Sequence, residues 1–83
     1  MKTYEFTVIL AEVDLMTDAM ADALYQAGCS DGSPFSGEGI AAVGFNREAV
    51  SLEAAIKSAI ADVERAGQRV ARVEIGSEEI AAL

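Results

Sequence analysis

The amino-acid sequence predicts an α+β domain, with an antiparallel four-stranded sheet and two helices on one of its faces. Residues 3–11 alternate between polar and apolar side chains, which is typical of a strand with one buried face. Residues 51–67 carry apolar side chains at the spacing of one helix face, between the N-cap residue Ser51 and the helix-ending Gly67. Pro34 cannot donate a backbone hydrogen bond, so a strand that contains it must lie at a sheet edge.

The first strand, residues 3–11, is expected to bury one of its two faces. Large apolar side chains occupy that face at Tyr4, Phe6, Val8 and Leu10. The opposite face is mainly polar and carries Thr3, Glu5, Thr7 and Ile9. Ile9 indicates that this second face is not wholly exposed to water.

A first helix is expected to follow and to end at Gly28. Asp14 and Thr17 are competing N-cap residues, which leaves the start of the helix open by about three residues. The apolar residues at helix spacing predict the buried stripe: Met16, Ala19, Met20, Ala23, Leu24 and Ala27.

Residues 29–39 are expected to form a short edge strand with Pro34, followed by a hairpin turn at residues 37–39. The third strand, residues 40–46, then buries alternate side chains at Ala41, Val43 and Phe45. The last strand, residues 68–75, follows the second helix and buries Ala71, Val73 and Ile75. Residues 77–83 are predicted to be the opening turns of a further helix.

The predicted order is strand, helix, strand, strand, helix, strand. Two right-handed crossovers around a hairpin give the ferredoxin-like βαββαβ arrangement, with both helices on one face of the sheet. The second strand occupies an edge in this topology, which agrees with the position of Pro34. A chain of 83 residues suits a single domain, residues 1–83.

The charge balance argues against two classes of partner. The net charge is −8, from 14 acidic and 6 basic residues. Nucleic-acid binding and adhesion to an anionic membrane both depend on basic side chains, so we expect neither. The acidic balance is compatible with a basic partner, a cation or plain solubility, and solubility is its commonest explanation.

Cys29 is the single cysteine of the chain, so no intramolecular disulfide can form. A lone cysteine, a first segment without a secretory apolar run and no stretch of membrane-spanning length predict a soluble cytoplasmic protein. The chain has no histidine to activate a thiol. We therefore expect Cys29 to be a buried structural residue, and we expect no cofactor.

Two clusters of charged residues are candidate binding sites. Glu12, Asp14 and Glu38 are expected at one end of the sheet, where with Asp18 they would form either a cation site or a solvated acidic surface. The solvated surface is the favoured interpretation, because the spacing does not match an EF-hand and no histidine or cysteine assists these acids.

Asp31, Asn46 and Arg47 are expected at the opposite end of the sheet, where the first helix ends and the second begins. One interpretation is an anion site that uses Arg47 and the N-terminus of the second helix. The other, which we favour, is a surface Asp31–Arg47 ion pair or a turn-stabilising Asn46, with a stability effect of about 1 kcal/mol or less.

The sheet face without helices predicts an interface. Ile9, Ile40 and Ala42 are expected to be apolar residues on that face, and exposed apolar patches usually have partners. We therefore predict a homo-oligomer, or docking on a protein partner.

Several segments of the chain resemble a family of small bacterial proteins. These segments are Ala-Gly-Cys-Ser-Asp at residues 27–31, Phe-Asn-Arg-Glu-Ala at 45–49, Ser51, residues 55–63 and residues 70–74. In many members of this uncharacterised family, a ferredoxin-like N-terminal domain precedes a helix-turn-helix segment. The resemblance implies the fold and no catalytic residue. Residues 1–83 stop where the DNA-binding part of longer members would begin, so we expect no DNA binding from them.

Three classes of function remain after these observations. The first is a non-catalytic binding or regulatory module that self-associates or docks on a protein partner. The second is a domain that senses a small ligand, such as an anion. The third, a small enzyme that relies on carboxylates alone, ranks last because no histidine or activated nucleophile supports it.

Overall fold

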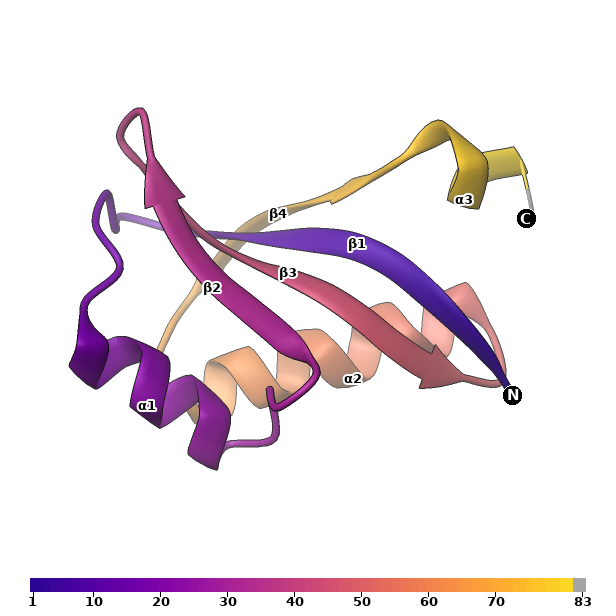
Figure 1. The fold of residues 1–83 in the computed structure, drawn as a ribbon, viewed down its shortest axis with the longest axis horizontal. Coiled ribbons are helices and arrows are strands. Elements are labelled where there is room, and N and C mark those ends of the chain that lie inside the picture. Colours follow the sequence, from indigo (N-terminus) through magenta and orange to yellow (C-terminus); the bar gives the residue numbers. More distant parts are fainter. Residues whose placement is uncertain (82–83) are drawn as a thin grey trace.

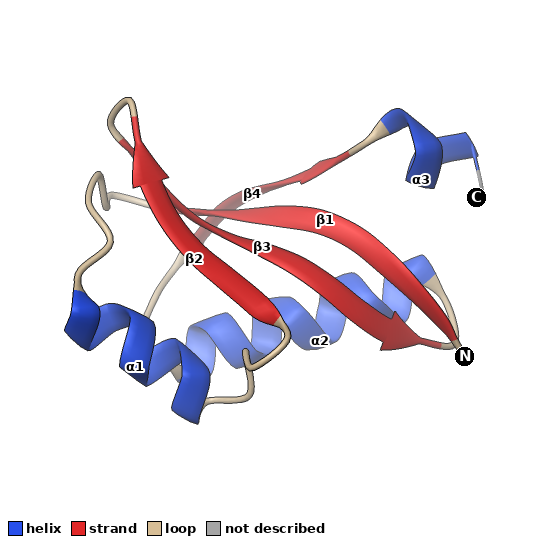
Figure 2. Cartoon of the chain, in the orientation of Figure 1, coloured by secondary structure: helices blue, strands red, loops and turns tan. Residues whose placement is uncertain are grey.

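The computed structural model describes residues 1–81 (Figures 1 and 2). Its strands are β1 (Lys2–Leu10), β2 (Gly32–Gly37), β3 (Ile40–Ala49) and β4 (Val70–Ile75). Its helices are α1 (Asp18–Gln26), α2 (Leu52–Arg65) and the short α3 (Ser77–Ala81). The α+β class is confirmed, and the remainder of the predicted last helix, residues 82–83, lies outside the described residues.

The four strands form one sheet in the order β2-β3-β1-β4, and every neighbouring pair is antiparallel. β1 lies at the centre, between β3 and β4. β2 lies at an edge, where the missing N–H of Pro34 leaves no ladder bond unmade. This confirms the edge position that Pro34 predicted.

Helices α1 and α2 cover the same face of the sheet, and α3 lies apart from them beyond the end of β4 (Figure 1). The core lies between the two helices and the sheet, where the Phe6 and Phe45 rings stack with centroids 5.4 Å apart. The alternate strand residues and the α2 stripe supply most of this core: Phe6, Val8, Leu10, Ala41, Val43, Phe45, Leu52, Ala55, Ala59 and Val63.

The helix boundaries follow from local capping. The Thr17 hydroxyl accepts a hydrogen bond from the Met20 N–H at 3.2 Å, so Thr17, rather than Asp14, begins α1. The Ser51 hydroxyl accepts from the Ala54 N–H at 3.1 Å and begins α2, as predicted. Gly28 and Gly67 follow the two helices with positive φ of 118° and 91°.

The hairpin between β2 and β3 is also set locally. Glu38 and Gly39 are its two central residues, with φ of 53° and 77°. Two positive φ values are characteristic of the type I′ turn, whose twist matches that of the flanking strands. The predicted turn at residues 37–39 is confirmed.

Three details differ from the sequence-based expectations. β3 continues past Asn46 to Ala49, because β1 is long enough to pair with it as far as Lys2. The register of β4 shifts opposite Ile9 and Leu10, so Val70 packs on the core and Ala71 is exposed. Ala19 is exposed, because it lies in the first turn of α1 on the solvent side.

Candidate functional site

Arg47 is buried on the helix side of the sheet, with 8% of its surface exposed. Its Nε and Nη2 donate to the Asp31 carboxylate oxygens Oδ2 and Oδ1 at 2.7 and 2.8 Å. Nη2 also donates to the Gly28 carbonyl at 3.0 Å, and Nη1 donates to the Ser58 hydroxyl at 3.1 Å. The guanidinium thus connects β3, which carries it, to three other parts of the chain: the end of α1, the connection that enters β2, and α2.

A second carboxylate completes this cluster. Asp62 Oδ2 on α2 lies 2.9 Å from Arg47 Nη1, and Asp62 also pairs with Arg65. A Cβ atom placed on Gly28 would lie 2.9 Å from Asp62 Oδ2. The chain after α1 therefore packs against the Asp62 carboxylate so closely that any side chain at Gly28 would displace it.

Asp31 and Arg47 each favour the charged form of the other. The hydrogen bonds from Arg47 lower the pKa of the Asp31 carboxyl below its ordinary value. The Asp31 carboxylate in turn raises the pKa of the Arg47 guanidinium. The expected Asp31–Arg47 ion pair is present, but it is partly buried rather than at the surface, because the Arg47 side chain is 10% and the Asp31 side chain 32% exposed.

Asn46 does not join this cluster. Its neighbour Arg47 points toward the helices, and strand alternation therefore places the Asn46 side chain on the opposite, helix-free face. Its backbone N–H contacts the cluster by donating to the Asp31 carbonyl at 3.2 Å. The structure brings Asp31 and Arg47 together, and it separates Asn46 from them.

Cys29 lies beside the same cluster with 2% of its surface exposed. Burial, followed by the nearby Asp62 carboxylate, raises the pKa of its thiol. A thiol with a raised pKa is a poor nucleophile at neutral pH. Cys29 is thus a buried residue of the core, as its sequence context predicted.

The acidic residues at the other end of the sheet are only partly gathered. Glu12 and Asp14 line a cavity of about 500 Å³ together with Gly39 of the hairpin. Glu12 is exposed and lies 3.5 Å from Arg69. Among residues 1–81, no group of three His, Cys, Asp or Glu side chains is close enough together to hold a metal ion.

The helix-free face of the sheet is built from lateral rows of paired residues. One row is apolar and runs from Phe35 on β2 through Ala42 on β3 to Ile9 on β1. The next row, toward α3, is formed by the small residues Ser33, Gly44 and Thr7, and ends at Glu74 on β4. A third row pairs Asn46 with Glu5.

The predicted interface residues lie together on this face, but they are less exposed than expected. Ile9 is 6% and Ala42 0% exposed, and Ile40 is half-buried. The Phe35 ring reaches across β3, because a Cβ atom placed on Gly44 would lie 3.8 Å from its Cε1. Phe35 itself is 51% exposed, so it is the accessible apolar residue of the row.

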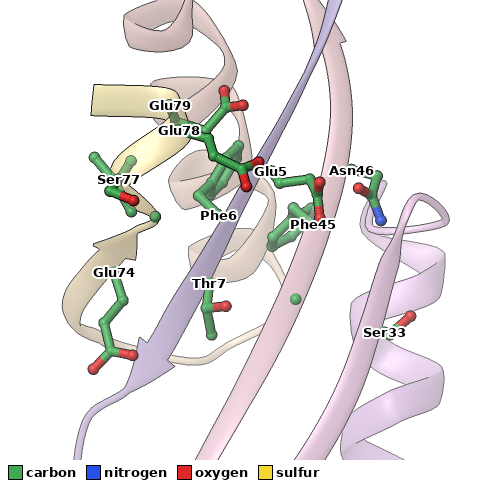
Figure 3. Close-up of a pocket in the computed structure, with 13 residues that line it drawn as sticks. Glu5, Phe6, Thr7, Ser33, Phe45, Asn46, Glu74, Ser77, Glu78 and Glu79 are labelled. Atoms are coloured by element: carbon green, nitrogen blue, oxygen red, sulfur yellow. The ribbon is translucent and has the colours of Figure 1, made fainter. Parts of the chain in front are cut away.

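A cavity of about 640 Å³ lies beside this row, between the helix-free face and α3 (Figure 3). Four carboxylates line it: Glu5 from β1, Glu74 from β4, and Glu78 and Glu79 from α3. Ser33, Thr7 and Gly44 contribute the small residues of its lining. The cavity therefore combines concentrated negative charge with space beside the strands.

Sequence reasoning missed three residues that matter here. Phe35 was missed because its strand was the weakest pattern in the chain, although its alternation with Pro34 gives its face. Asp62 could have been suspected, because it lies four positions after Ser58 on the same side of α2. Glu79 gave no signal, since only the position of α3 brings it to the sheet.

Comparisons with known protein families, with curated proteins and with solved structures found no match to this chain. Within the described residues, no helix is long and apolar enough to cross a membrane.

Proposed function

We propose that this chain is a non-catalytic binding module that acts through the helix-free face of its sheet, by self-association or by docking on a protein partner. The observation that carries the proposal is Phe35, a half-exposed aromatic ring at the end of the apolar row Phe35–Ala42–Ile9. Aromatic side chains supply much of the binding energy of protein interfaces. An acid-lined cavity beside the ring adds polar groups that can select a partner.

The polar groups on the helix side support a structural rather than a catalytic role. Arg47 is engaged by Asp31, Asp62, Ser58 and the Gly28 carbonyl. The Cys29 thiol is buried, and the chain has no histidine. These contacts also weaken the alternative of an anion sensor at Arg47, because an anion would have to displace two carboxylates from the guanidinium.

The proposal includes the fold family and the setting. The strand order β2-β3-β1-β4, with antiparallel neighbours and with α1 and α2 on one face, supports a ferredoxin-like assignment. That assignment is compatible with the resemblance to small bacterial proteins. The free thiol of Cys29 is compatible with a reducing compartment such as the cytoplasm. The acidic surface argues against nucleic acid and anionic membranes as partners.

Sedimentation velocity from low to high micromolar concentration tests the proposal. We expect weak self-association that Phe35→Ser reduces, and that added salt strengthens because salt screens the repulsion between two acidic copies. Tyr25→Ser is the matched control, because Tyr25 is an exposed aromatic residue on α1. A strict monomer would contradict self-association. Equal effects of the two substitutions would contradict the assignment of the helix-free face.

A further inference from the structure

The charges around the α3 cavity are of one sign. Glu5, Glu74, Glu78 and Glu79 line it, and within the part of the chain that the structure describes no lysine or arginine does. Arg72 lies next to this lining and is paired with Glu74, with Nη2 3.3 Å from Oε2. Within residues 1–81 none of the other three carboxylates pairs with a basic side chain, so the field in the cavity favours a cation.

One of these carboxylates has an unmet need for a hydrogen-bond donor. Glu79 Oε2 is shielded from solvent, and no group within residues 1–81 donates to it. Shielding a carboxylate oxygen without a donor costs free energy, which a guanidinium or ammonium group would recover through a charge-assisted hydrogen bond. A cationic group that draws the Glu79 carboxylate toward the cavity would supply the missing donor, in agreement with the negative charge of the lining.

The spacing of the rows on the helix-free face indicates which second side chain an occupant would carry beside the cationic group. The row of Ser33, Gly44 and Thr7 is two residues from the Phe35–Ala42–Ile9 row, or about 7 Å along the strands. Phe35 lies on β2, whereas the carboxylates lie on β1, β4 and α3, so an occupant of both must cross the sheet from the β2 edge. An extended segment presents alternate side chains to the face at the same interval. With an apolar side chain on Phe35, a basic side chain two positions away can enter the cavity at Ser33 and Gly44, and its length carries the charged group toward the carboxylates.

We propose that the helix-free face docks an extended basic segment of a different protein, whose arginine or lysine enters the α3 cavity while an apolar side chain two positions away packs on Phe35. This inference rests on the proposed function and names the partner's chemistry. A second copy is a poorer occupant, because it brings its own acids to this face and its Arg72 is already paired with Glu74.

The test uses a short acetylated and amidated peptide in which leucine and arginine stand two positions apart. The control peptide carries citrulline, which has the shape of arginine without its charge. Titration into the ¹⁵N-labelled protein should shift the amide signals of Thr7, Gly44 and Gly76, which lie at the cavity. We expect binding that weakens with added salt, in contrast to self-association, and no binding of the citrulline peptide.

Two variants that change the net charge equally test whether the peptide binds at the cavity. Glu79→Gln should weaken peptide binding about tenfold, because it removes a charge-assisted contact. Glu64→Gln changes the net charge equally but lies on α2, away from the cavity, and should bind as the unmodified protein does. Phe35→Ser should also weaken binding, whereas Tyr25→Ser should not.

Each contrary result would overturn the inference. If Glu79→Gln and Glu64→Gln weaken peptide binding equally, the binding depends on net charge and not on the cavity. The same shifts produced by spermidine alone would make the occupant a small polyamine rather than a protein segment. Phe35-dependent self-association without peptide binding would leave the proposed function in place and refute the basic partner.

Discussion

Arg47 and Asp31 form a partly buried two-point ion pair, with Nε–Oδ2 and Nη2–Oδ1 distances of 2.7 and 2.8 Å. Asp31 lies in the connection that enters β2, and Arg47 lies near the end of β3. The same guanidinium contacts the Gly28 carbonyl after α1 and the Asp62 carboxylate on α2. One side chain therefore fixes the places where both helices meet the sheet.

Arg47→Ala should lower the free energy of unfolding by about 3 kcal/mol, because it leaves the partly buried Asp31 carboxylate without a cation and the Gly28 carbonyl without its donor. This exceeds the effect expected of a surface pair. Arg69→Ala is the control, since its pair with Glu12 is exposed on both sides, and it should cost less than about 1 kcal/mol. Urea unfolding measures both. A small effect of Arg47→Ala would contradict a structural role for the cluster.

Adding an anion distinguishes a structural role of Arg47 from a role in sensing a ligand. Inorganic phosphate should leave the melting temperature unchanged, because the guanidinium donors already have acceptors. A rise in melting temperature that disappears in Arg47→Ala would identify an anion site instead.

The Asp31–Arg47 pair should make stability depend on pH in the acid range. The pKa of Asp31 in the folded protein lies below its ordinary value. The pair therefore stabilises the protein fully at any pH above the ordinary pKa. The stabilisation is lost as the pH falls through the folded pKa. The stability difference between the unmodified protein and Asp31→Asn should therefore shrink on acidification, as measured by urea unfolding at several pH values. A difference that is constant with pH would show that the Asp31 charge does not stabilise the fold.

Gly28→Ala should be more destabilising than Gly67→Ala. Both residues follow a helix with positive φ, so alanine strains the backbone at either position. At Gly28 the added Cβ also meets the Asp62 carboxylate at 2.9 Å, whereas no neighbouring atom of residues 1–81 lies within 4 Å of a Cβ at Gly67. We expect a cost of about 1 kcal/mol at Gly67 and clearly more at Gly28. Thermal unfolding compares them, and equal losses would contradict the close packing of Asp62.

Glu79→Gln should raise the melting temperature of the free protein, because a shielded charged oxygen without a donor is replaced by a neutral group. A gain of about 1 kcal/mol corresponds to a rise of about 4 °C in a domain of this size. Glu78→Gln, at the neighbouring exposed position of α3, is the control and should change little. Calorimetry would reveal the difference. A loss of stability in Glu79→Gln alone would show that its carboxylate is satisfied in the folded protein.

Local chemistry determined much of this fold from the sequence alone. Ser51 and Gly67 predicted the limits of α2 because capping depends on residues within one turn of the helix end. The alternation along residues 3–11 predicted which side of β1 enters the core, and Pro34 predicted an edge strand because it lacks an N–H. The Asp31–Arg47 pair was also expected, since the predicted order of elements brings both residues to the end of the sheet where the first helix ends and the second begins.

Contacts between distant segments decided the rest. The burial of Arg47 depends on Gly28, Ser58 and Asp62, which come from two helix regions on either side of it in the sequence. Ile9 and Ala42 lose their exposure because the Phe35 row assembles across three strands. The α3 cavity forms only because β4 delivers Glu78 and Glu79 to the edge of a face that also carries Glu5. No local pattern records such an approach, because it depends on where the strands place residues that are far apart in the chain.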